Sequence, residues 1–254
     1  MKHKNGFTLL EMSVVLAIIG LLIGAILLGQ SMIREAQLRD AIGEYDTYLK
    51  AIKEFQDKYL ALPGDMSTAV TIWGATTANG DGSGTIGTCV TAATPLNTAG
   101  TGGISNAGEW YLAWQHLTLA GLIPGNFTGT STDGTTAVVG SNVPASKLAG
   151  AGWTINYYLN ATTDTGLWRD QYGHLLNLGG YLATNYTINP IMTPQEALEI
   201  DSKIDDGIPG TGKVRAWRTS VLANCTNNDT TQAAQTYNTS YAGQACALVF
   251  LLGF

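Results

Sequence analysis

Apolar residues run almost without interruption from Phe7 to Gly29, and Glu11 is the one charged residue among them. A helix of this length and composition can span a hydrocarbon layer of ~30 Å. A carboxylate inside such a span costs on the order of 2.5–3.5 kcal/mol by insertion scales, so it needs a partner. The pattern therefore predicts a membrane helix that carries one functional acid.

From Arg34 onward the pattern becomes amphipathic, because apolar residues recur at every third or fourth position. No proline interrupts residues 8–62, and Pro63-Gly64 ends the segment. We expect one helix of roughly 50 residues, about 75–80 Å long at ~1.5 Å per residue. Its second half would pack on a sheet; a coiled-coil seam is the alternative, although two heptads are marginal for one. The apolar stripe comprises Leu38, Ile42, Tyr45, Leu49, Ile52, Phe55 and Tyr59.

The remainder of the chain predicts shorter elements. A second helix is expected at 108–121, and a third from Thr193 to about Ile204, with Pro194 in its first turn and Glu196 completing a capping box. Residues 66–108 carry a single charge and predict a long loop with short ordered pieces. Strands are expected at 153–159, 180–188, 213–221 and 247–252. The fold class is therefore α+β, a long N-terminal helix laid on an antiparallel sheet.

Composition excludes some functions. Charged residues make up 13% of the 254-residue chain, against a typical ~25%, and the formal net charge is −6. There is no Lys/Arg cluster, so no nucleic-acid-binding patch is evident. His116 falls in a predicted helix and His174 in a predicted loop, without a serine elbow or zinc-ligand spacing. We expect a non-enzymatic protein whose six tryptophans belong to the core.

The segment Lys4-Asn5-Gly6-Phe7-Thr8-Leu9-Leu10-Glu11-Met12 resembles the processing site of type IV pilins and of type II secretion pseudopilins. The resemblance implies that prepilin peptidase cuts after Gly6 and methylates the new amine of Phe7. It also implies that Glu11 faces the amine of a neighbouring subunit during assembly. Two buried opposite charges satisfy each other better than either does alone, although pairing of Glu11 with its own Phe7 amine stays open. An ordinary signal anchor is the plainer alternative.

This resemblance sets the expected domain organisation and partners. The segments are a leader at 1–6, an assembly helix at 7–30, the amphipathic half of the same helix at 31–62 and a globular head at 63–254. Lys2 and Lys4 precede the span, so the N-terminus is expected in the cytoplasm. The implied partners are prepilin peptidase, other pilin subunits, the inner membrane and the assembly machinery.

The function that the resemblance implies is a structural subunit of a type IV pilus or pilus-like filament. Before assembly its head would be periplasmic, and afterwards it would belong to a cell-surface pilus or a periplasmic pseudopilus. A type II secretion pseudopilin or minor tip subunit is one alternative. A membrane-anchored periplasmic binding protein or hydrolase is an alternative of a different class.

The three cysteines are Cys89, Cys225 and Cys246. A Cys225–Cys246 disulfide would close a loop of about 20 residues and contribute roughly 3 kcal/mol in an oxidising compartment. Many pilins similarly carry a disulfide in the C-terminal region. A bridge that uses Cys89, or three free thiols, stays open, because pairing cannot be read from spacing.

Calcium is the one cofactor that the sequence raises. Residues 79–86 resemble the front of a calcium-binding loop and make Asp81 a candidate ligand, but Val90 occupies the twelfth position and excludes the usual EF-hand. Some pseudopilins bind calcium near the C-terminal region. A solvated turn after a capped helix is the alternative there. The second group of candidate ligands is Asp201, Asp205 and Asp206.

Overall fold

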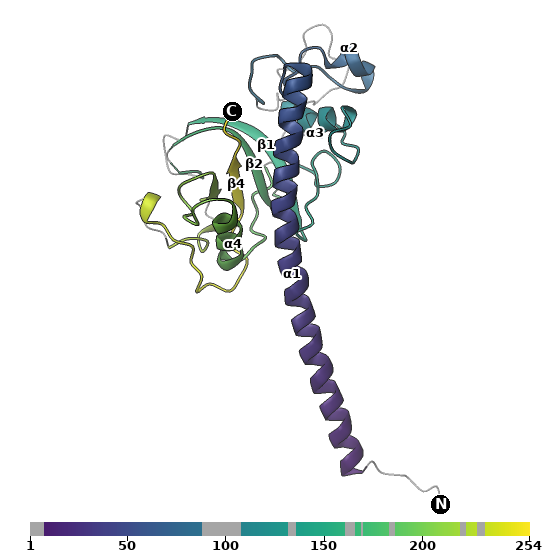
Figure 1. Ribbon diagram of the computed structural model, residues 1–254, viewed down its shortest axis with the longest axis vertical. Helices are drawn as coiled ribbons and strands as arrows, with labels where there is room; N and C mark the ends of the chain where they lie inside the picture. The colour runs from purple at the N-terminus through teal and green to yellow at the C-terminus, as the bar shows by residue number, and fades with distance from the viewer. Residues whose placement is uncertain are drawn as a thin grey trace, which may run out of the picture.

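The computed structural model describes residues 8–87, 108–131, 136–160, 166–168, 170–182, 186–218, 222–227 and 232–254. A head domain lies against the upper half of one long helix, and the lower half of that helix projects free of the head (Figure 1). The helices are α1 (Leu9–Tyr59), α2 (Ala69–Trp73), α3 (Glu109–Leu119) and α4 (Pro194–Ile204). The strands are β1 (Ala151–Asn160), β2 (Gln171–Gly180), β3 (Val214–Ala216) and β4 (Leu248–Leu251).

Helix α1 confirms the prediction of a single long helix, with 51 residues. It ends at Tyr59, just before the predicted boundary, because Leu60 adopts a left-handed φ of 52° and its N–H donates to Gln56 O. The predicted stripe faces the head, but three residues that the spacing did not mark also do so: Ala41, Tyr48 and Ala51. The buried residues of α1 are Leu38, Ala41, Tyr45, Tyr48, Ala51, Ile52 and Phe55.

The sheet is antiparallel throughout, with strand order β1-β2-β4-β3. Its inner face packs against α1, where the Tyr45 and Phe250 rings stack with centroids 4.9 Å apart. Trp153 of β1 joins this contact, with its ring centroid 5.4 Å from that of Phe250 and 5.7 Å from that of Tyr48. Because side chains alternate along a strand, a second apolar cluster forms on the outer face, around Leu175 and Val249.

The prediction of a strand at 180–188 is wrong. Strand β2 ends at Gly180, and residues 181–182 and 186–188 are irregular. Gly180 exchanges N–H···O bonds with Asn189 at 2.8 and 3.1 Å, so the chain folds back on its own strand end. A Cβ on Gly179 would meet Thr187 O at 2.2 Å, so only glycine allows this approach. His174, predicted in a loop, lies within β2.

The other elements follow the prediction more closely. Helix α3 and strands β1 and β4 are confirmed to within three residues at each end. Strand β3 is shorter than predicted and covers three residues, and 219–221 lie outside the described part of the chain. Helix α4 begins with the predicted capping box of Thr193 and Glu196. Trp114, Trp153, Trp168 and Trp217 are buried, as expected of core residues.

Candidate functional site

The amino-terminal half of α1 is an apolar surface without cover in the subunit. An 18-residue window of α1 has a mean hydropathy of 2.7, and none of it is buried. Among the described residues α1 is the one helix long and apolar enough to cross a membrane, by length and composition. Exposed apolar side chains extend from Leu9, 92% exposed, to Ile33, 61% exposed. An apolar patch of this size marks a membrane or protein contact.

Glu11 lies at the first turn of this apolar helix and closes a capping box with Thr8. The Thr8 N–H and Oγ1 donate to Glu11 Oε2 at 2.7 and 2.8 Å, and the Glu11 N–H donates to Thr8 Oγ1 at 3.2 Å. Sequence analysis missed Thr8 as a partner, although Thr-x-x-Glu is the signature of this cap. The acid therefore has local hydrogen-bond donors beside the predicted cleavage point. Gly6 and Phe7 lie outside the described residues.

Arg34 joins α1 to the head at the point where the uncovered half of the helix ends. Its Nε and Nη2 donate to the two carboxylate oxygens of Glu196 at 2.6 and 3.0 Å, and Nη2 also donates to Ile191 O at 2.7 Å. Burial alone would raise the pKa of Glu196, but the hydrogen bonds from Arg34 and from the Thr193 N–H outweigh burial and lower it. Sequence analysis did not find this pair, which spans most of the chain.

Three carboxylates meet near the carboxyl end of α1. Oxygens of Asp65, Asp81 and Glu109 lie within 4.8 Å of one another. Glu109 is 2% exposed, and burial raises its pKa to about 7 although the Asp81 and Gly87 N–H groups donate to it. Sequence analysis identified Asp81 alone, because the other two acids come from distant segments. The cluster offers the oxygen ligands that calcium prefers.

The second predicted acidic group also comes together, at the end of α4. Oxygens of Asp201, Asp205 and Asp206 lie within 4.8 Å of one another. Asp201 is fully buried and accepts hydrogen bonds from the Tyr237 hydroxyl at 2.8 Å and the Gly207 N–H at 3.2 Å. Burial raises the pKa of Asp201 to about 7 against the effect of these bonds. Calcium binding at either cluster stays a prediction.

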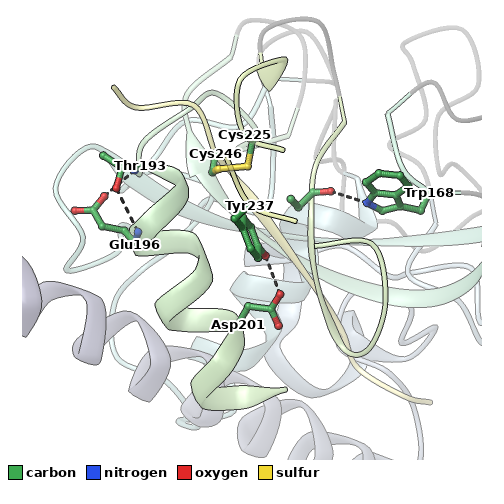
Figure 2. Close-up of a disulfide and its surroundings, with 8 residues drawn as sticks. Trp168, Thr193, Glu196, Asp201, Cys225, Tyr237 and Cys246 are labelled. Atoms are coloured by element: carbon green, nitrogen blue, oxygen red, sulfur yellow. Dashed lines mark hydrogen bonds between the residues drawn. A yellow bond between two sulfur atoms is a disulfide. The ribbon is translucent and has the colours of Figure 1, made fainter. Parts of the chain in front are cut away.

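A disulfide between Cys225 and Cys246 closes the segment that carries Tyr237. Figure 2 shows Tyr237 below this disulfide, with its hydroxyl directed at Asp201 on α4. The bridge thus holds a loop in place against α4 and the acidic group. Cys89 lies outside the described residues.

The two histidines of the head bind main-chain groups with both ring nitrogens. His116 Nδ1 accepts from the Gly64 N–H at 3.0 Å, and its Nε2 lies 3.1 Å from Ala78 O. His174 Nε2 accepts from the Ile86 N–H at 3.2 Å, and its Nδ1 lies 2.9 Å from Phe254 O. Burial lowers the pKa of both rings, that of His116 to about 4. Both side chains therefore fasten the 61–87 loop to the head.

Comparison with known proteins gives a match for the N-terminal residues of the chain. A family model of the prokaryotic N-terminal methylation motif matches residues 1–27. No curated protein and no solved structure gave a significant match to the chain. The chain therefore carries a prepilin-type leader of the kind found in type IV pilins and pseudopilins. The leader is followed by an apolar helix suited to membrane anchoring, and this helix is part of a pilin-like α+β fold.

Proposed function

We propose that this chain is a structural subunit of a type IV pilus or pilus-like filament, processed after Gly6 by prepilin peptidase and polymerised through α1. One observation carries the proposal: α1 is a continuous 51-residue helix whose first half is apolar and uncovered while its second half holds the head. In a subunit of this shape, the apolar half of α1 has to be covered by something other than the subunit itself, first by lipid and then by other copies of the chain. Contacts between copies that do not close on themselves generate a filament.

Glu11 has a specific role in this proposal. The Glu11 carboxylate accepts hydrogen bonds from Thr8, and we expect this cap to persist in the membrane. Cleavage after Gly6 places a cation at Phe7, so an incoming subunit can pair its Glu11 with the amine of a subunit already in the filament. The local cap lowers the cost of keeping the acid in lipid, and the intermolecular pair favours the register in which both charges are satisfied.

Two measurements test the proposal. Mass spectrometry of the mature chain should find methylated Phe7 at the N-terminus; a chain that still begins at Met1 would contradict processing. Glu11→Ala should be cleaved and folded but should not enter sheared filaments. Ser13→Ala, at a polar position in the same turn whose hydroxyl donates to Leu10 O, is the matched control and should assemble. Normal filaments from Glu11→Ala would refute the charge pairing.

A pseudopilin or minor subunit would share all of this chemistry. The copy number of the chain in purified filaments separates the possibilities, because a major subunit forms the bulk of the fibre. An uncleaved, unassembled chain would instead favour a membrane-anchored binding protein or hydrolase.

A further inference from the structure

A groove of about 610 Å³ runs along one side of α1, between the helix and two segments of the head. Gly43 and Thr47 of α1 line it together with Phe127 and Pro144 of the head. The charged residues of the lining are exposed, except for Glu44, which is partly buried. The full lining is Arg39, Asp40, Gly43, Glu44, Thr47, Tyr48, Pro124, Phe127, Pro144, Ala145 and Lys147.

Two polar side chains of the lining, Glu44 and Thr47, already have partners within the subunit. Glu44 accepts from Ser146 Oγ at 2.6 Å, from Trp153 Nε1 at 2.8 Å and from the Lys147 N–H at 2.8 Å. The Thr47 hydroxyl donates to Gly43 O at 2.7 Å. An apolar partner can therefore displace water from the groove without leaving these groups unpaired, which is the usual cost of burying polar atoms. Polar groups that are already paired in this way suit an interface that excludes water.

The groove also continues the uncovered apolar face of α1. Met32, Ala36, Arg39, Gly43 and Thr47 follow one another at spacings of three and four and so share one side of the helix. Met32 is 71% exposed, and Ala36 is exposed as well. A surface that meets other copies along the first half of α1 therefore leads directly into the groove.

Gly43 has no structural reason to be glycine within the subunit. It lies in the middle of α1, where glycine is among the poorest helix formers, and a Cβ built on it meets no atom within 4 Å. Small residues of this kind let the backbone of a second helix approach closely.

We propose that this groove seats the apolar amino-terminal half of α1 from a second copy of the chain. The proposal rests on the proposed filament function and adds a head-domain surface to it. The occupant follows from chemistry: Gly43, Phe127 and Pro144 give the lining an apolar part, and residues 9–33 of α1 are an exposed apolar segment that assembly brings next to other copies. Arg39, Asp40 and Lys147 are exposed residues of the lining and can stay in contact with water beside an apolar occupant.

The decisive variant is Gly43→Leu, which fills the groove while keeping the subunit intact. Because nothing lies within 4 Å of the new Cβ, the head should fold, the leader should be removed and the melting temperature should be unchanged or higher. The amount of chain in sheared filaments should fall by about tenfold or more, which corresponds to the loss of one well-packed contact. Lys53→Leu, which adds the same side chain at an exposed position of α1 outside the groove, should assemble like the wild type.

A photo-crosslinking residue in place of Thr47 identifies the occupant in cells that make the filament. We expect adducts to residues 9–33 of a second chain. Adducts only to the head of another copy, or to lipid or an unrelated protein in assembled filaments, would overturn the assignment. Assembly of Gly43→Leu at wild-type yield would refute the proposed role of the groove alone. If the wild-type chain forms no filaments, the filament function and the role of the groove are both refuted.

Discussion

The ion pair between Arg34 and Glu196 should contribute measurably to holding the head on α1. Exposed ion pairs contribute ~0.2–1 kcal/mol, whereas breaking a fully buried pair costs ~3–5 kcal/mol. The side chains of Arg34 and Glu196 are 25% and 17% exposed, and the contact is bidentate, so this pair lies between the two limits. We expect a coupling free energy of about 1–2 kcal/mol.

A double-mutant cycle of Arg34→Gln and Glu196→Gln measures this energy. Urea unfolding of the mature chain in mild detergent, followed by tryptophan fluorescence, gives the four free energies of unfolding. The exposed pair of Arg39 and Glu35, at 3.9 Å, is the internal control and should couple by less than ~0.5 kcal/mol.

The pH dependence of the coupling provides a second check. Because the pKa of Glu196 is lower in the folded state, its stabilising effect is complete above the unfolded value of ~4.3. The effect is lost as pH falls through the still lower folded value. A coupling no larger than that of Arg39 and Glu35, or one that persists in strong acid, would refute the reasoning.

Three further predictions concern the head. Replacing both Cys225 and Cys246 by serine should lower the free energy of unfolding by about 3 kcal/mol, as measured by denaturation without reductant; an unchanged value would contradict the loop-entropy argument. His116→Gln should lower the free energy of unfolding most near neutral pH, because the pKa of buried His116 is lowered to about 4. Its neutral ring stabilises the fold above the unfolded pKa of ~6.5, and this contribution is lost towards pH 4, so the gap to wild type should shrink by about 3 kcal/mol. A stability difference between wild type and His116→Gln that does not change with pH would exclude a contribution from the neutral ring. Calcium bound by the acidic clusters would raise the melting temperature, less so in Asp81→Asn or Asp205→Asn; an unshifted wild-type transition would eliminate both sites.

The sequence predicts the parts of this fold whose signals are local. The extent of α1 follows from the uninterrupted apolar and amphipathic pattern, and the start of α4 follows from Thr193 and Glu196. Strand β2 was missed because polar residues such as Gln171 and Asn177 and its glycines conceal a strand that tertiary pairing stabilises. The β-prone residues after Gly180 led to a wrong strand prediction for the converse reason, because Gly180 pairs with Asn189 and the described residues between them are irregular.

The candidate sites show the same division. The acidic group at the end of α4 lies within six residues of sequence, so its members could be identified together, whereas Asp65 and Glu109 reach Asp81 only through the tertiary fold. The contact of Arg34 with Glu196 joins residues far apart in sequence and leaves no local signal. Thr8 could have been found, because its distance in sequence from Glu11 is diagnostic of a cap.

For the proposed export of the head, the position of β4 sets an order of events. This strand lies between β2 and β3, and Cys246 immediately precedes it. In the exported head that we propose, β3 lacks its neighbour β4 and Cys225 cannot reach Cys246 until residues 246–251 have left the translocation channel. Oxidation and closure of the sheet must therefore wait for the last strand to emerge, and an interrupted export would leave an open edge that chaperones or proteases can recognise.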